Sequence, residues 1–66
     1  MSNVRTTLIE ARKDKGWTQD ELASRVNISR AYLTNIERGV YVPSLKVAKR
    51  ISESLGRSTD FLFFEN

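Results

Sequence analysis

The chain has 66 residues, a net charge of +3 and 39% hydrophobic residues, which suffices for one small domain with a single core. It contains no Cys and no His, which excludes disulfides, Cys/His zinc sites, thiolate nucleophiles and the usual neutral-pH general base. The longest apolar run, Phe61 to Phe64, is too short to cross a membrane, and we expect no signal peptide before the first helical pattern. We therefore expect one cytoplasmic domain over residues 1–66, with no metal, no cofactor and no membrane partner. The basic excess suits an anionic partner, although ordinary surface charge explains it too.

Two helices are predicted in the first half of the chain. The first spans residues 4–16, because three apolar residues recur there at helical spacing: Val4, Leu8 and Ala11. The second opens at Thr18, whose hydroxyl and the carboxylate of Glu21 form the two halves of a capping box. It ends near Asn27, a residue that readily adopts the left-handed conformation found after helices.

A third helix follows after a very short turn. Ser29 caps it, and it runs to Arg38 before Gly39 stops it. Two helices joined by so few residues are typical of a helix-turn-helix, here over about residues 18–38.

Two further helices complete an all-α domain. An extended loop through Pro43 leads to Ser44, which caps a fourth helix that Gly56 ends. A last short helix is expected at about residues 60–63, although the run of aromatic residues there could be partly extended. The sequence thus predicts five helices and no strand.

The outward face of the third helix carries the functional information. Leu33 and Ile36 mark its buried side, and the opposite arc holds only polar or small residues: Arg30, Ala31, Thr34, Asn35 and Arg38. Arg bonds guanine, Asn bonds adenine, and Thr and Ala contact the thymine methyl group, so these residue types suit the major groove of DNA. A merely solvated helix face would look the same from this pattern alone.

Several polar residues have two readings at this stage. Glu37 lies at the edge of the buried side and needs a partner, for which Arg12 is the candidate, unless Glu37 is solvated. Gln19 at the start of the second helix could hold a DNA phosphate, or it could be a neutral member of the capping box. Tyr32 either packs on the core or reaches a phosphate, and Tyr41 is a backbone contact or a loop anchor.

The combined pattern resembles the Cro/phage-repressor (Xre) helix-turn-helix family. The matching motifs are Thr18-Gln19-x-Glu21-Leu22-Ala23, Ile28-Ser29-Arg30-x-Tyr32-Leu33-x-x-Ile36-Glu37-Arg38-Gly39 and Pro43-Ser44-Leu45, and the resemblance covers about residues 4–63. It implies a compact, five-helix, lambda-repressor-like domain that binds double-stranded DNA as a transcriptional regulator.

The resemblance assigns roles residue by residue. Base contacts are expected from Arg30, Ala31, Thr34 and Asn35. DNA backbone contacts are expected from Gln19, Ser29, Tyr32, Arg38 and Tyr41. Arg12 and Glu37 match a family pair that joins the first and third helices. The loop at Val40-Tyr41-Val42 lacks the Lys, Arg or Asn of many relatives, which implies a weaker phosphate interaction.

The resemblance also implies how the protein works. We expect a repressor that binds a palindromic operator as a homodimer, with no small-molecule effector evident. The alternatives are a controller of a restriction–modification system, which both activates and represses, and an antitoxin-type protein-interaction module. An enzyme is not expected, because the chain offers no His or Cys and its acidic residues are scattered.

The dimer interface is expected in the C-terminal segment, about residues 57–66. A domain of this size can hardly bury three neighbouring aromatic rings, so the expected interface comprises Phe61, Phe63 and Phe64 with Val47. Residues 42–45 could complete the patch. The alternative is a monomer in which all three rings cover the core.

Overall fold

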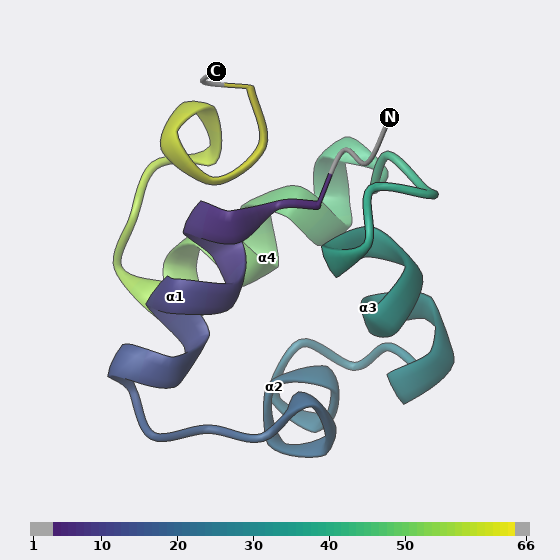
Figure 1. Ribbon diagram of the computed structural model, residues 1–66, viewed down its shortest axis with the longest axis vertical. Coiled ribbons are helices and arrows are strands. Elements are labelled where there is room, and N and C mark those ends of the chain that lie inside the picture. Colours follow the sequence, from purple (N-terminus) through teal and green to yellow (C-terminus); the bar gives the residue numbers. More distant parts are fainter. Residues whose placement is uncertain (1–3, 65–66) are drawn as a thin grey trace.

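The structure is a computed structural model that describes residues 4–64. The regular secondary structure of these residues consists entirely of helices, which loops connect (Figure 1). The elements are α1 (Thr6–Asp14), α2 (Gln19–Arg25), α3 (Arg30–Glu37), α4 (Leu45–Leu55) and a short π-helix, η1 (Asp60–Phe64). The predicted all-α, five-helix class is therefore confirmed. Residues 1–3 and 65–66, the outer ends of the predicted domain and of its C-terminal segment, lie outside the described residues. No helix in the described part is long and apolar enough to span a bilayer.

Side-chain caps fix where α2, α3 and α4 begin. The hydroxyl of Thr18 accepts from the Glu21 backbone N–H at 3.1 Å, and the Glu21 carboxylate accepts from the Thr18 backbone N–H at 2.8 Å, so the predicted capping box is present. Hydrogen bonding to Thr18, first through its backbone N–H and then through its hydroxyl, lowers the pKa of the Glu21 carboxyl. The hydroxyl of Ser29 accepts from the Tyr32 N–H, and Ser44 caps α4 in the same way.

Left-handed residues fix where the chain turns. Asn27, at φ 61°, makes the tight turn between α2 and α3, and Gly56, at φ 68°, ends α4. Both positions were predicted from residue type. The turn brings α3 back beside α2, which lies at the bottom of Figure 1 with α3 to its right.

The start of the first helix differs from the prediction. α1 begins at Thr6, and Val4 precedes it with 46% of its surface exposed. The backbone N–H of Arg5 donates to the carbonyl oxygen of Glu37 at 2.8 Å. The chain is thus held at the C-terminal end of α3 before α1 starts, and Val4 cannot join the apolar face of α1.

The last helix is a single π-helical turn. The hydroxyl of Ser58 accepts from the Phe61 N–H at 3.1 Å, and the hydroxyl of Thr7 on α1 donates to the Phe61 carbonyl oxygen at 3.1 Å. Leu62 is 1% exposed and points into the core. The turn over residues 60–64 therefore packs against α1.

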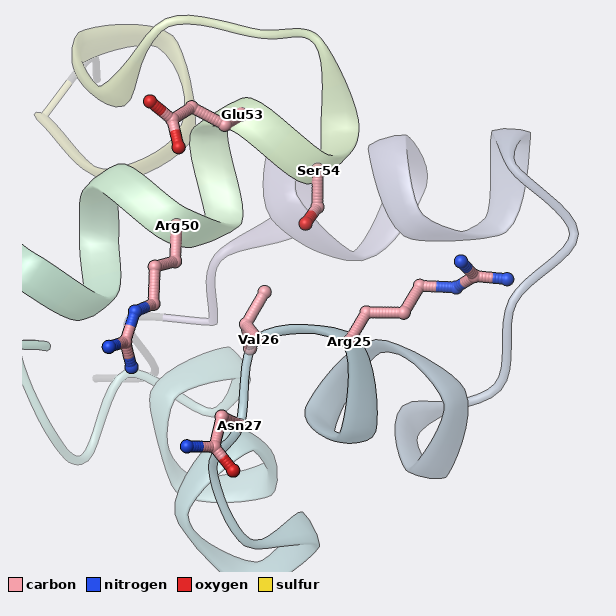
Figure 2. A pocket seen from close by; sticks show the side chains of 6 residues that line it. All are labelled: Arg25, Val26, Asn27, Arg50, Glu53 and Ser54. Carbon is pink, nitrogen blue, oxygen red and sulfur yellow. The ribbon is translucent and has the colours of Figure 1, made fainter.

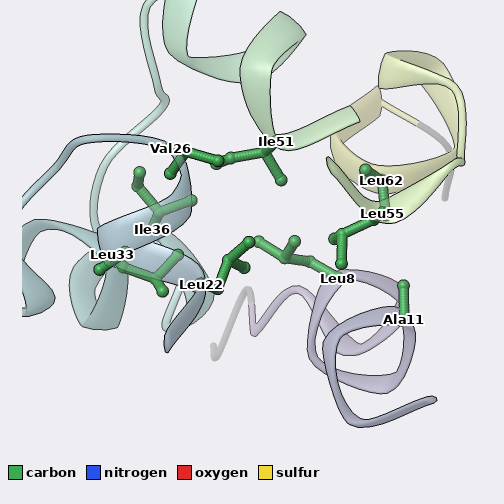
Figure 3. Close-up of a cluster of buried hydrophobic side chains, with 10 residues drawn as sticks. Leu8, Ala11, Leu22, Val26, Leu33, Ile36, Ile51, Leu55 and Leu62 are labelled. Carbon is green, nitrogen blue, oxygen red and sulfur yellow. The ribbon is translucent and has the colours of Figure 1, made fainter. Parts of the chain in front are cut away.

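The core draws on every helix (Figure 3). Its buried members are Leu8, Ala11, Leu22, Ala23, Val26, Leu33, Ile36, Ile51, Leu55 and Leu62. Apolar residues of α3 at positions 33 and 36 are fully buried, which leaves the opposite side of that helix facing outward.

Arg5 connects three separate parts of the fold, and the sequence patterns did not single it out. Its Nη1 donates to the carbonyl oxygens of Ile36 and Tyr41 at 2.7 and 2.9 Å. Its guanidinium also lies 5.7 Å from the centre of the Phe63 ring. Arg5 thus adds a charged donor to the Ile36 carbonyl oxygen at the end of α3, which also accepts from the Gly39 N–H at 3.1 Å. Burial lowers the pKa of its guanidinium.

We expect Arg5→Met to lower the free energy of unfolding by about 1–3 kcal/mol, because two backbone carbonyls lose a charged donor. Chemical denaturation measures the loss. Lys13→Met, at an exposed position of α1, is the control and should leave stability nearly unchanged. Equal stability of the two variants would contradict a structural role for Arg5.

Candidate nucleic-acid interface

The outward arc of α3 is accessible along its length. Arg30, Ala31 and Arg38 are exposed, and Thr34 and Asn35 are half-buried. Because these residues face away from the core, their side chains are presented on one surface. The structure thus brings together all five residues that the sequence pattern placed on this arc.

Arg30 has one weak neighbour on α2. Its Nε lies 3.9 Å from Oδ1 of Asp20, and the two side chains are 64% and 72% exposed. An ion pair this open to water contributes little to stability. The guanidinium of Arg30 can therefore exchange Asp20 for another acceptor at small cost.

A buried ion pair lies beneath this surface. Arg12 donates to Glu37 through Nε to Oε2 at 2.7 Å and through Nη2 to Oε1 at 3.2 Å. The residues are only 8% and 2% exposed, and Nη1 of Arg12 also donates to the Trp17 carbonyl oxygen at 2.8 Å. The predicted partners are thus in contact, in the two-bond geometry that favours Arg over Lys.

Gln19 and Thr34 extend this pair to the surface. Nε2 of Gln19 donates to Oε1 of Glu37 at 2.8 Å, and the Thr34 hydroxyl donates to Oε1 of Gln19 at 3.0 Å. We name the four residues Arg12, Gln19, Thr34 and Glu37 the polar network. The sequence indicated Thr34 as a DNA contact and Gln19 as a DNA contact or a neutral member of the capping box. Nothing in the pattern shows which residues of α2 and α3 face each other.

The candidate backbone contacts lie around the same surface. The Ser29 oxygen caps α3, so its hydroxyl hydrogen can still be donated outward. Tyr32 and Tyr41 pack together, with ring centres 6.0 Å apart at 46°. The backbone N–H groups of Val40 and Tyr41 both donate hydrogen bonds to the carbonyl oxygen of Asn35, at 2.9 and 3.3 Å. The loop is thereby tied to the end of α3.

Exposed apolar surface gathers in this loop more than in the C-terminal segment. Phe61, Phe63 and Val47 are half-buried and pack against the core, and Phe64 alone of the predicted interface residues is largely exposed, at 59%. We name the larger exposed group the loop patch: Val40, Tyr41, Val42 and Leu45. Leu45 and Val42 are 80% and 70% exposed.

A shallow hollow lies between the end of α2 and α4 (Figure 2). It is lined by Arg25, Val26, Asn27, Arg50, Glu53 and Ser54. The guanidinium of Arg25 extends toward Trp17 and lies 4.2 Å from its ring centre. The hydroxyl of Ser54 and the carboxylate of Glu53 point away from each other in the hollow (Figure 2), and the described residues contain no cluster of three or more potential metal ligands.

Two helices joined by a tight turn, with an outward polar arc on the second, have the arrangement of a helix-turn-helix domain. The helix-turn-helix family profile matches residues 8–62. The chain belongs to this family, in its Cro/Xre-like form, which is a family of DNA-binding regulators and not of enzymes.

Several relatives resemble most of the chain. An uncharacterized HTH-type transcriptional regulator of Methanothermobacter thermautotrophicus is 48% identical over 54 residues, which cover 82% of this chain and 78% of that protein. The regulator YqaF of Bacillus subtilis is 44% identical over 63 residues, or 96% of this chain and 82% of YqaF. The crystal structure of the hypothetical transcription factor NHTF from Neisseria has a TM-score of 0.77 at 29% identity, with 83% of this chain and 62% of that chain covered.

A phage protein is similar over a shorter stretch. The immunity repressor protein of Bacillus phage phi105 is 44% identical over 45 residues. These cover 68% of this chain but only 31% of the phage protein, so the likeness is confined to less than a third of that repressor.

We expect Glu37→Gln or Arg12→Met alone to lower the free energy of unfolding by roughly 3 kcal/mol, because each leaves a buried charge without its partner. The double variant should lose clearly less unfolding free energy than the sum of the losses in the two single variants. Thermal and chemical denaturation of all four proteins measure the coupling. Additive losses would show that the pair contributes no mutual stabilisation.

Proposed function

We propose that the protein is a transcriptional repressor that binds a palindromic operator in double-stranded DNA as a homodimer. The observation that supports this most is the outward arc of α3, which carries Arg, Thr and Asn side chains above the polar network. Side chains that read base edges must be held on a rigid element. Here three helices are joined beneath that arc by the buried hydrogen bond between Arg12 and Glu37 and by the half-buried bonds of Gln19 to Glu37 and of Thr34 to Gln19.

We assign base reading to the arc and phosphate binding to its margins. Arg30 projects from the first turn of α3, where its guanidinium can bond guanine through two atoms, and Asn35 offers an amide suited to adenine. Ala31 supplies a methyl group for contact with thymine. Arg38 follows the last turn of α3, and we place it on the DNA backbone together with Gln19, Ser29, Tyr32 and Tyr41.

We place the centre of the dimer interface on the loop patch, with Phe64 and Val47 at its edge. Leu45 and Val42 are the most exposed large apolar side chains of the described residues, and a two-fold contact between copies would cover them. The described domain measures 28 × 22 × 22 Å. Two copies of this size can touch while their α3 helices stand about 34 Å apart, the spacing of successive major grooves on one face of DNA.

Repression is the regulatory sense that we propose. The likeness to the phi105 immunity repressor supports it, since the shared 45 residues form part of a protein named for repression. A dimer that occupies a promoter excludes polymerase without further contacts. A reporter gene placed under the selected operator would show lower expression when the protein is present, whereas higher expression would indicate an activator.

We expect Arg30→Ala and Arg38→Ala to weaken DNA binding in different ways. Arg30→Ala should cost about 1–3 kcal/mol on the selected operator and relax the preference at one base pair of each half-site. Arg38→Ala should weaken binding to all sequences alike and reduce the salt slope by about one. Binding titrations on operator and random DNA at several salt concentrations separate the two. An equal loss from Arg30→Ala on both DNAs would remove it from base reading.

We expect Leu45→Glu to convert the dimer to a monomer at micromolar concentration, because it places a charge at the centre of an apolar contact. Phe64→Glu should have a smaller effect, and Lys15→Glu, at an exposed position after α1, should have none. Sedimentation equilibrium measures the association constant of each. A monomer produced by Phe64→Glu but not by Leu45→Glu would return the interface to the C-terminal segment.

A further inference from the structure

We infer that the buried carboxylate of Glu37 sets the hydrogen-bonding polarity of Thr34, so that Thr34 reads DNA as an acceptor and selects bases that carry an exocyclic amine. The inference rests on the proposed function, since it assumes that α3 enters the major groove. It deepens that function by naming the class of base that Thr34 recognises.

The first step is the charge at the base of the polar network. The Glu37 carboxylate is paired with the Arg12 guanidinium through two hydrogen bonds and is 2% exposed. A guanidinium can only donate and an ionised carboxylate can only accept. Any third group that meets Glu37 must therefore be a donor.

The second step is the orientation of the Gln19 amide. Its two ends differ, since the nitrogen donates and the oxygen accepts. The nitrogen faces Glu37 at 2.8 Å, and the opposite orientation would set the amide oxygen against a carboxylate oxygen. The charge of Glu37 thus fixes the Gln19 oxygen on the side of Thr34.

The third step reaches the DNA-facing surface. The Thr34 hydroxyl donates its hydrogen to Oε1 of Gln19 at 3.0 Å, so only its lone pairs remain to face outward. Thr34 lies one helical turn after Arg30 and one before Arg38, on the same side of α3. Its hydroxyl therefore lies in the row of side chains assigned to the groove.

This arrangement removes an ambiguity that a threonine normally has. A hydroxyl that rotates freely either donates or accepts, and so discriminates poorly between bases. Because its hydrogen is donated to Gln19, the Thr34 hydroxyl can accept a hydrogen bond from the N6 amine of adenine or the N4 amine of cytosine. Opposite the keto oxygen of guanine or thymine, two acceptors face each other and repel. The polar network thus adds a preference at one position that the Thr side chain alone would not give.

The test begins by locating the base that Thr34 reads. Site selection with the wild-type protein gives the operator, and the position whose preference changes in Thr34→Val is the Thr34 position. We expect the wild type to prefer an amine base there over the corresponding keto base by about fivefold or more. Thr34→Val, which keeps the shape but lacks the hydroxyl, should lose this preference.

The decisive variant is Gln19→Met, which removes the acceptor for the Thr34 hydrogen and leaves the Arg12–Glu37 pair intact. We expect its amine-to-keto ratio at the Thr34 position to fall below about twofold, because the hydroxyl can then rotate and donate. Any loss of a phosphate contact by Gln19 lowers affinity for all sequences and cancels in this ratio. Thermal unfolding confirms that the variant is folded, and Ser24→Ala, on the exposed side of α2, should keep the wild-type ratio.

The outcomes separate the inference from the proposed function. A wild type that selects no DNA site overturns both. A wild type that selects a site but prefers a keto base at the Thr34 position, or shows no change in Thr34→Val, overturns the inference alone. A ratio that stays at the wild-type value in folded Gln19→Met also overturns it.

Discussion

The carboxylate of Glu37 is the point at which three helices are held to one geometry. It lies on α3 and receives hydrogen bonds from Arg12 of α1 and Gln19 of α2. A charge 2% exposed is tolerable only while these partners stay in place, because its desolvation costs several kcal/mol when they leave. Rotation of α3 about its axis, or sliding along α2, breaks at least one of the bonds. The orientation of α3 relative to α1 and α2 therefore depends on this one carboxylate.

The same constraint extends beyond the helix-turn-helix. The last carbonyl oxygens of α3 accept hydrogen bonds from Arg5, and the carbonyl oxygen of Asn35 accepts from backbone N–H groups of the following loop. Arg5 also reaches the carbonyl oxygen of Tyr41 and the ring of Phe63. The loop that carries the exposed apolar side chains is thus fastened to the C-terminal end of α3. A contact between copies made through this loop would therefore restrict the distance between their two α3 helices to a narrow range.

Much of the fold could be predicted from local chemistry, and the rest depends on tertiary geometry. The capping box at Thr18 and the left-handed turn at Asn27 follow from residue type, and both are present. The contact of Thr34 with Gln19 depends on how two helices cross, and the role of Arg5 depends on backbone carbonyls, which every residue carries. Aromatic content was likewise a poor guide to exposure, since Thr7 and the core hold the C-terminal turn on α1 and cover most of its rings.

The outward arc of α3 contains two kinds of residue, which tolerate substitution to different degrees. Arg30 and Ala31 are exposed, and the only ion pair of Arg30 among the described residues is the open one with Asp20. Substitution at such positions changes stability by only about 0.5 kcal/mol or less. New side chains are therefore tolerated there without loss of the fold, and under the proposed base-reading role one or two such changes would give another DNA target. Thr34 lacks this freedom, because its half-buried hydrogen bond to Gln19 belongs to the polar network that ends on the buried Glu37 carboxylate. Divergence among descendants of this chain should therefore begin at the first turn of α3.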